Sequence, residues 1–366
     1  MTPFPKSLAR TVAAGLLFSL IGAPLFAREL KVDARGGAEY NTLAAASAAA
    51  RPGDTILIAK GSGPYRETLY IKQSGTAEAP IVVEGNGETI TALVPLVFQK
   101  EGDIWTARLP LPFPCVLMHK GERVLQDPAA PADTFLAPIR LREDKRTVEL
   151  LPGASPEGWE ASARDCPVRI SNCSWQTFRN LVATGGTNDG FNLHGDGKGL
   201  RFENITGCNN MDEGFSSHDT MSCEIEGGEF WGNDNGLANA PICVMTARNL
   251  RIHDNLGWGL VFNGASFAYL FNVQVWGNGM AQIIFGPTSA GSCERVVAWA
   301  PTWPSRPWRS YTESSTSKAA ALTFRGETEK LDPAKWQGSP QIATTPIPSI
   351  PKAATAANPS LAVSVK

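Results

Sequence analysis

The chain has 366 residues, of which 43% are hydrophobic and 19% are charged, with a formal net charge of −2. This composition is too apolar for a disordered protein, and it lacks the excess of Lys and Arg that nucleic-acid binding requires. We therefore expect a globular protein with no nucleic-acid partner. Its 35 glycines are about one residue in ten, above the usual ~7%, and many recur at regular intervals, which indicates regular turns.

The beginning of the chain has the pattern of a secretory signal peptide. It carries Lys6 and Arg10 without an acid, residues 11–22 are an apolar run, and small residues lead to a cleavage point after Ala27. The alternative is an uncleaved membrane anchor, but the apolar run is shorter than the ~20 residues that span a bilayer. We predict a signal peptide over residues 1–27, a secreted or periplasmic mature chain, and no membrane span after processing.

The next segments predict a cap, a first strand and an insertion. Tyr40–Ala50 is rich in Ala and predicts a short helix over the open end of the core, and Gly53–Ile58 predicts the first strand. Residues 93–151 interrupt the rhythm of the chain, and runs such as Thr147–Leu151 indicate short strands. A small β insertion beside the main fold is the prediction for this segment.

A repeat of about 20–25 residues occupies the middle of the chain. Phe178–Leu181 followed by Asp189–His194 recurs one unit later as Phe202–Ile205 followed by Glu213–His218, with Phe, Asn, Gly, Phe and His in register. Further copies start at Ile225, Ala247, Leu270 and Cys293. Such a short β-like unit cannot bury its apolar face alone and must stack on its neighbours, which predicts a parallel β-helix. Leucine-rich repeats have a similar period, but their helical half and Leu spacing are missing.

The alternation of side chains along each predicted strand sorts the repeat positions into columns. The inward columns are Phe191, Phe215, Leu237, Leu260 and Ile283, and next to them Leu193, Phe262 and Phe285. The outward columns are Asn192, Ser216 and Ala238, and then His194, His218, Ala240, Asn263 and Gly286. We expect the outward columns to form an exposed face.

Three segments before the repeats carry a family resemblance. Arg51–Ile56, Gly63–Glu67 and Ser74–Ile81 resemble the amino-terminal coils of secreted right-handed β-helix proteins of the pectate-lyase-like superfamily. With the repeats, the resemblance covers residues 32–300. It implies an all-β, right-handed parallel β-helix with an N-terminal helical cap and a small β insertion. The superfamily includes lyases, hydrolases, epimerases and binding proteins, so the resemblance implies the fold more than the reaction.

The domain organisation that follows is simple. The β-helix domain extends over residues 28–336, including the insertion, and residues 337–366 form a flexible tail rich in Pro, Ala and Thr. Seven cysteines lie in the mature part; their spacing matches no zinc pattern, and their odd number leaves at least one unpaired. We expect a monomer whose partner is a polysaccharide.

Two neighbouring repeats hold the densest group of titratable residues. His194 and His218 occupy equivalent positions, and stacked coils about 4.8 Å apart would place them side by side. The structural alternative is a ladder of like residues that serves packing alone. The same repeats supply four acids and two cations, which are Asp189, Asp212, Glu213, Asp219, Lys198 and Arg201.

These residues suggest proton transfer on an acidic sugar chain. β-Elimination from a uronate polymer needs a base for the C5 proton, an acid for the leaving oxygen and a cation for the substrate carboxylate. His218 is the predicted base, His194 the acid or carboxylate donor, and Lys198 or Arg201 the cation. Asn192, Asp219 and Asn263 are the predicted substrate-binding residues. Asp189, Asp212 and Glu213 are candidate ligands of a Ca²⁺ ion, which normally takes 6–8 oxygens.

Three other functions stay open. Ser216–Asp219 is similar to the Asp-Pro-His-Asp motif of mannuronan epimerases, but only His218 and Asp219 match. Asp189–Asn192 resembles the Asp-Gly-Phe-Asp turn of pectate lyases, with Asn in place of the last acid, which weakens a calcium-dependent pectate mechanism.

A glycoside hydrolase would use paired carboxylates, either Asp189 with Glu213 or Asp212 with Asp219. A glycan-binding protein without catalysis would use aromatic platforms, for which the candidates are Trp231, Trp258 and Trp276.

Overall fold

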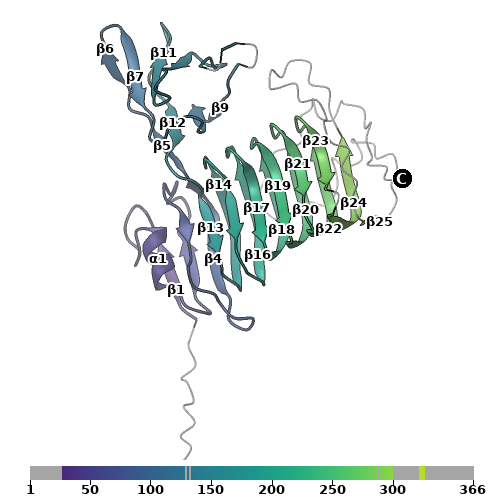
Figure 1. The fold of residues 1–366 in the computed structure, drawn as a ribbon. Helices are drawn as coiled ribbons and strands as arrows, with labels where there is room; N and C mark the ends of the chain where they lie inside the picture. Colours follow the sequence, from purple (N-terminus) through teal and green to yellow (C-terminus); the bar gives the residue numbers. More distant parts are fainter. Residues whose placement is uncertain (1–26, 128–129, 132, 287, 300–320, 326–366) are drawn as a thin grey trace, which may run out of the picture.

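The computed structural model describes residues 27–127, 130–131, 133–286, 288–299 and 321–325. The predicted tail and all of the predicted signal peptide except Ala27 lie outside these residues. The described chain is a parallel β-helix in which two sheets wind around one core, with a small antiparallel unit beside it (Figure 1). The predicted fold class is therefore confirmed.

The larger sheet, which we call sheet A, has ten strands among the described residues. Most of its longer strands bend in the middle, where Asn180, Asn204, Asn249 and Asn272 have φ of 52°, 52°, 56° and 54°. Asn tolerates this left-handed conformation better than most residues. The strands, in spatial order, are β1 (Glu29–Val32), β2 (Thr55–Ile58), β4 (Ile81–Thr91), β14 (Gln176–Thr184), β16 (Leu200–Cys208), β18 (Ser222–Trp231), β20 (Val244–His253), β22 (Phe267–Trp276), β24 (Ala290–Trp299) and β25 (Ala321–Arg325).

The second sheet, sheet B, has seven shorter parallel strands among the described residues. From β15 to β23, each follows a sheet A strand in the chain after a short turn, so that each of these coils contains one strand of each sheet, whereas β13 follows the antiparallel unit described below. The order in space follows the order in sequence, as stacked repeats require. The strands are β3 (Leu69–Tyr70), β13 (Val168–Ser171), β15 (Phe191–His194), β17 (Glu213–Asp219), β19 (Asn235–Pro241), β21 (Trp258–Phe262) and β23 (Ala281–Phe285).

The register of sheet B confirms the predicted inward columns. Phe191 pairs with Phe215, then with Leu237, Leu260 and Ile283 in successive strands. The first four are buried in the core, and Ile283 packs against it. The continuous column removes apolar surface from water, at roughly 1.5–3 kcal/mol for each large side chain, and it fixes the register of the coils.

A short helix covers the first coil. Helix α1 (Leu43–Ala49) buries Leu43 and Ala46 against the core. The Thr42 side chain accepts from the Ala45 N–H at 3.2 Å, and the Glu67 carboxylate accepts from the N–H groups of Leu43 and Ala44 at 3.0 Å each. These bonds satisfy N–H groups of the first turn, which have no partner inside the helix. The predicted helical cap is confirmed.

An antiparallel unit interrupts the coils between β4 and β13. We call residues Leu93–Ser162 the side domain; its antiparallel strands continue beyond the predicted end of the insertion at residue 151. It has its own core around Trp159, which is 1% exposed. Its strands are β5 (Leu93–Pro95), β6 (Gln99–Glu101), β7 (Ile104–Arg108), β8 (Leu117–His119), β9 (Glu122–Val124), β10 (Ile139–Leu141), β11 (Thr147–Leu150) and β12 (Trp159–Ser162).

Two further features bear on the sequence predictions. The seven cysteines are all buried with free thiols. Across the described ranges, no helix combines the length and the apolar character needed to cross a membrane.

Candidate functional site

The outward face of sheet B carries the candidate site. Because its inward positions are filled by the core columns, the alternate positions of β13, β15 and β17 point away from the core. The register places Arg169, Asn192 and Ser216 in one outward column. A second column holds Ser171, His194 and His218 beside them. Three neighbouring coils therefore present one polar patch.

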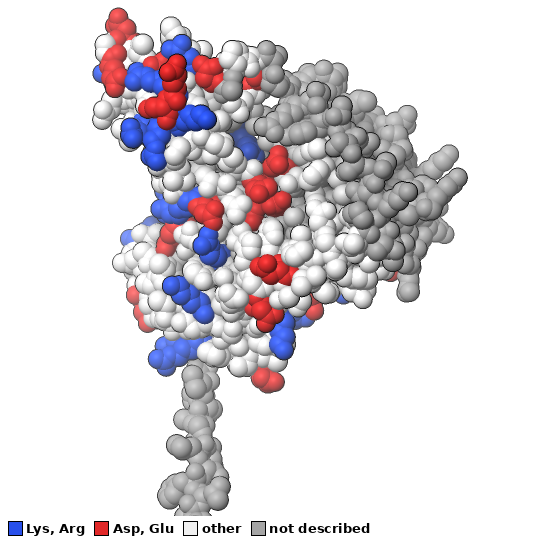
Figure 2. Space-filling view, in the orientation of Figure 1, with Lys and Arg blue, Asp and Glu red and all other residues white. Residues whose placement is uncertain are grey.

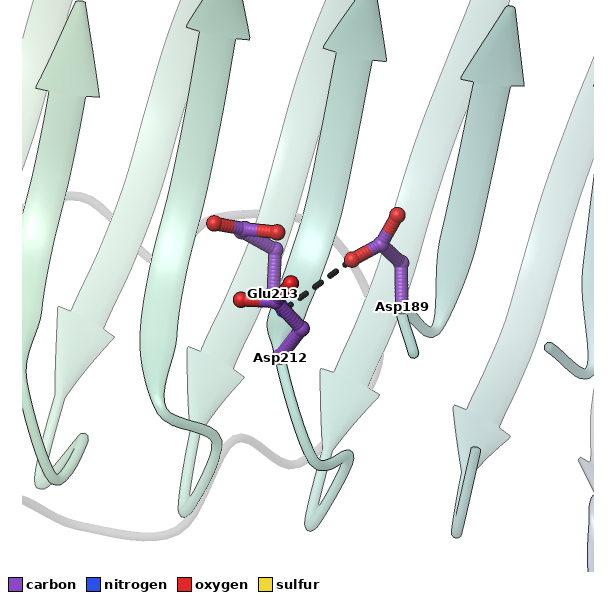
Figure 3. Close-up of side chains that lie close together, drawn as sticks. All are labelled: Asp189, Asp212 and Glu213. Atoms are coloured by element: carbon purple, nitrogen blue, oxygen red, sulfur yellow. Dashed lines mark hydrogen bonds between the residues drawn. The ribbon is translucent and has the colours of Figure 1, made fainter. Parts of the chain in front are cut away.

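Three carboxyl groups converge at the start of these strands. Asp189 lies in the turn before β15, Asp212 in the turn before β17, and Glu213 is the first residue of β17. One oxygen from each lies within 4.8 Å of the other two. Figure 3 shows the three side chains clustered across two adjacent coils, with the Glu213 N–H donating to Asp189 at 3.1 Å. We call this group the acid cluster.

Burial and the charge of a neighbouring carboxylate keep a proton on Glu213. Asp189 is 1% exposed, and burial raises its pKa. Burial, together with the neighbouring charge of Asp189, raises the pKa of Glu213 to about 10. Among the described residues, no Lys or Arg forms a salt bridge with any of the three carboxylates to offset these effects. Glu213 is therefore a neutral, proton-donating acid at pH 7, which is the condition for general acid catalysis.

Amide side chains hold the carboxyl groups of Asp189 and Glu213 in place. Asn192 Nδ2 donates to Asp189 Oδ2 at 2.6 Å, and Asn235 Nδ2 donates to Glu213 Oε1 at 3.0 Å. Asn235 in turn accepts from the Trp258 N–H at 3.0 Å. The acid cluster is thus fixed by neighbouring coils on both sides, and the carboxyl groups have little freedom to reorient.

The predicted pair of histidines forms one stack. The rings of His194 and His218 lie 4.3 Å apart with an interplanar angle of 4°. His194 Nδ1 lies 3.4 Å from Asp219 Oδ2, which also accepts from the Gly195 N–H at 2.7 Å. His218 Nε2 is hydrogen-bonded to the Ser216 hydroxyl. Burial and the charge of His194 lower the pKa of His218, so this ring is neutral at pH 7 and available as a base.

The structure brings some of the predicted residues together and separates others. Asn192 and Asp219 contact the site, whereas Asn263 is exposed in the histidine column two coils further on. Lys198 is exposed in the turn between β15 and β16. Arg201 belongs to sheet A, where its guanidinium pairs with Glu224 at 3.1 Å. Neither predicted cation lies in the outward columns of sheet B.

The first outward column is less exposed than we expected, whereas His194 and Asn263 of the second column are exposed. Asn192, Ser216 and Ala238 are 3%, 0% and 7% exposed. The hydrogen bonds of Asn192 to Asp189 and of Ser216 to His218 account for part of this, since each polar side chain lies against its larger neighbour. The column positions predicted that these side chains point outward. They did not predict the burial, because burial depends on the side chains that lie beside them.

Arg169 is a site residue that sequence reasoning missed. It stands in the outward column next to Asn192, and its guanidinium pairs with Asp165. The pKa of Arg169 is raised, mainly by its hydrogen bond with the Cys166 thiol and further by nearby negative charge. Val168–Ser171 precedes the first recognised repeat by one unit, which is the signal that could have found Arg169. This strand lacks the Phe and the His that mark the two later repeats, so its equivalence is hard to see from sequence.

One of the predicted aromatic platforms is wrong. Trp276 is 1% exposed and its ring stacks on His253 at 4.2 Å, so it has no face for a sugar. Trp231 and Trp258 are partly exposed, next to turns. Trp276 is enclosed because it follows His253 in a sheet A column, a neighbour that local sequence does not reveal.

The charge of the site is acidic. Asp189, Asp212, Glu213 and Asp219 face Arg169 alone among the cations of the outward columns, and Arg169 is already paired. In the space-filling view, acidic groups lie across the middle of the β-helix, while the side domain carries both signs (Figure 2). An anionic sugar would meet repulsion here unless a cation intervened.

The acid cluster offers an incomplete set of ligands for Ca²⁺. Carboxylate oxygens are the hard donors that this ion prefers, and three of them converge here. Three residues supply fewer than the usual 6–8 oxygens, so waters or sugar oxygens would complete the shell. The donor chemistry fits the ion, and the number of protein ligands is low.

Comparison with known proteins identifies the fold. No protein-family model matches the chain, and no curated protein matches it by sequence. XylC, solved in complex with xylose, superposes with a TM-score of 0.50 at 12% identity, over 75% of this chain and 66% of XylC. Pectate lyase Pel9A gives a TM-score of 0.48 at 15% identity, over 75% of this chain and 63% of its own. An alginate lyase from Paenibacillus sp. str. FPU-7 gives 0.36 at 13% identity, over 74% of this chain and 66% of its own. The chain thus spans about two thirds of the length of these proteins, and it shares a fold with XylC at low sequence identity.

Proposed function

We propose that this protein hydrolyses glycosidic bonds of a polysaccharide at the acid cluster on sheet B. The observation that carries the proposal is the convergence of Asp189, Asp212 and Glu213, with oxygens within 4.8 Å of one another and no cation paired with them among the described residues. Hydrolysis needs one protonated and one ionised carboxyl group flanking the bond. The fold of XylC, which was solved with xylose bound, is consistent with a carbohydrate ligand.

The burial of each carboxyl group assigns its role. Glu213, which is partly exposed, gives its proton to the glycosidic oxygen as the bond from the anomeric carbon breaks. Asp212, also partly exposed, attacks the anomeric carbon as the leaving oxygen departs and forms a glycosyl ester. Water then displaces Asp212 from that carbon and gives its proton to Glu213, which restores both carboxyl groups. Asp189 is buried and keeps Glu213 protonated through its negative charge. Because the spacing is nearer to the ~5–5.5 Å of retaining enzymes than to the ~6.5–9.5 Å of inverting ones, we expect retention of configuration.

A substrate panel tests this function. The full chain is incubated with neutral and uronate polysaccharides, and new reducing ends and unsaturated uronate ends are measured separately. We expect reducing ends without unsaturation from a neutral substrate, and their loss in Glu213→Gln. Glu224→Gln, an exposed Glu on sheet A that pairs with Arg201, is the matched control and should cleave normally. Binding of a glycan with no product would contradict hydrolysis and leave a glycan-binding protein.

The stacked histidines favour β-elimination as a second candidate. His218 is a neutral base on the same face, and Asp212 lies near enough to act on its charge. A uronate substrate would then need Ca²⁺ at the acid cluster, where the ion would neutralise the sugar carboxylate. This function predicts ultraviolet-absorbing unsaturated ends that depend on added Ca²⁺ and disappear in His218→Ala. An altered sugar stereochemistry at constant chain length would instead indicate an epimerase.

The cellular setting of this activity is also a proposal. An apolar amino-terminal run with preceding positive charge fits export, and large glycans are outside most cells. We expect the mature protein in the culture medium or the periplasm, which fractionation of the native host would show.

A further inference from the structure

The side domain starts from the same edge of the β-helix as the acid cluster. It is inserted between β4 of sheet A and β13 of sheet B. Asp189 occupies the turn between β14 and β15, and Asp212 the turn between β16 and β17, which are the corresponding turns of later coils. Figure 1 shows the side domain standing over one end of these strands. Topology therefore directs the insertion toward the catalytic turns.

One hairpin of the side domain contacts the turn that carries Asp212. Met211, the residue before Asp212, packs against an apolar cluster that includes Val116 and Met118. Met118 is in β8, which pairs with β9 in an antiparallel hairpin. The Met211 N–H donates to Gly186 O at 2.9 Å, which ties the same turn to the coil before it. The hairpin thus lies next to the turn that carries Asp212 of the acid cluster.

Arg123 in β9 fastens this hairpin to two coils at once. Its guanidinium Nη1 donates to the carbonyl of Asn210 at 2.9 Å and also to that of Gly232. The Asp234 N–H in the second turn donates to the carbonyl of Asp212 at 2.9 Å. Burial lowers the pKa of Arg123 to about 10, and the charge of Asp234 opposes this effect. Removing a guanidinium group even partly from water is costly, so its two carbonyl acceptors mark a specific attachment.

We propose that the β8–β9 hairpin forms one side of the carbohydrate site, and that Arg123 is the positioning residue that holds it beside Asp212 and Glu213. The hairpin then contacts a sugar unit next to the one whose bond is cleaved. This inference rests on the proposed function, and it names the part of the chain that senses the length of the substrate. A sugar chain too short to reach the hairpin gains nothing from it.

The test compares Arg123→Met with Arg140→Met on substrates of increasing length. Arg140 is in the same domain and pairs with the Glu149 carboxylate at 2.6 Å, away from the hairpin. We expect Arg123→Met to lower kcat/KM for the longest chain by about ten- to a hundred-fold, and for the shortest cleaved chain by less than about threefold. Arg140→Met should match the wild type at every length. An equal loss at all lengths, or none, overturns the inference.

Two further measurements keep the result decisive. Binding of the longest chain to Glu213→Gln, with and without Arg123→Met, reports on the hairpin without catalysis; weaker binding supports the inference even if hydrolysis is the wrong reaction. If Arg123→Met does not fold, Arg123→Lys replaces it in the same series. Hydrogen exchange of residues 117–124 in the unmodified protein should slow when the oligosaccharide is added, and unchanged exchange there overturns the inference.

Discussion

Two groups of acidic side chains on successive coils are built in opposite ways. The acid cluster on sheet B has three carboxyl groups and, among the described residues, no cation paired with them. On sheet A, Glu229 is 5% exposed but is 3.1 Å from His253 Nε2 and 3.5 Å from Arg251 Nε. The other nitrogen of His253 lies 2.9 Å from Asp254. We call the sheet A group the His253 cluster.

The difference separates a structural network from a chemical one. In the His253 cluster each charge meets an opposite charge; burial lowers the pKa of His253, but the hydrogen bonds with Asp254 and Glu229 outweigh it and raise the pKa overall. In the acid cluster, burial and like charges keep a proton on Glu213. Neutralised charges stabilise a fold, whereas an acid held protonated at pH 7 retains the capacity to donate.

The largest expected effect comes from the acid cluster. Glu213→Gln removes the proton donor while keeping its size and the neutral state it has at pH 7. We expect kcat to fall by about 10²–10⁴-fold, the usual contribution of a general acid, with no loss of melting temperature. Steady-state kinetics and calorimetry on the same preparation check both halves. Full activity in a folded Glu213→Gln protein would falsify the assignment.

The His253 cluster should give the reverse result. Glu229→Gln leaves Arg251 and His253 with one fewer anion in a buried place, and breaking such a pair costs about 3–5 kcal/mol. Denaturant unfolding should show this loss, while the rate per folded molecule stays near that of the wild type. Glu224→Gln on the exposed face of sheet A should change stability by less than about 1 kcal/mol. A stable but inactive Glu229→Gln protein would move the catalytic centre to sheet A.

The fold was predictable because the same sequence pattern recurs in successive coils. Phe178 and Phe202 are one repeat apart and pair in adjacent strands of sheet A, and the register in sheet B places His194 and His218 in one stack, as their spacing predicted. The acid cluster followed from the same arithmetic, since Asp189 and Glu213 hold equivalent positions. Periodicity therefore predicts which residues meet along the axis of the β-helix.

Contacts between residues that do not occupy equivalent positions of the repeat were not predictable in this way. Arg201 is near His194 in sequence, but the intervening turn moves it to sheet A. Arg123 is far from Asp212 in sequence and reaches its turn only because the side domain folds back. Trp276 is buried through its stacking with His253, which depends on the register of sheet A. These contacts depend on turn geometry and domain docking, which carry no repeat signal.

Asp189→Asn sharpens the comparison through pH. The charge of Asp189 helps to raise the pKa of Glu213, so its removal lowers that pKa. Since Glu213 works protonated, the alkaline limb of the pH–rate profile should move to lower pH, and the rate should fall about tenfold for each pH increment of one above the lowered pKa. Asn235→Ala removes a hydrogen bond that lowers the pKa of Glu213, so it should move the alkaline limb the other way. Identical pH–rate profiles in all three proteins would contradict the coupling.

The smallest effect concerns the two kinds of histidine. His253 has a raised pKa, so its stabilising contribution is complete below the unfolded value of about 6.5 and is lost as pH rises through the folded value. His218 has a lowered pKa, so it favours unfolding as pH falls below about 6.5. An NMR titration of the ring protons, assigned with His218→Gln and His194→Gln, should show His253 still charged where His218 is neutral. If His253 loses its proton first, the His253 cluster is not neutralised as described, and the contrast between the two sheets fails.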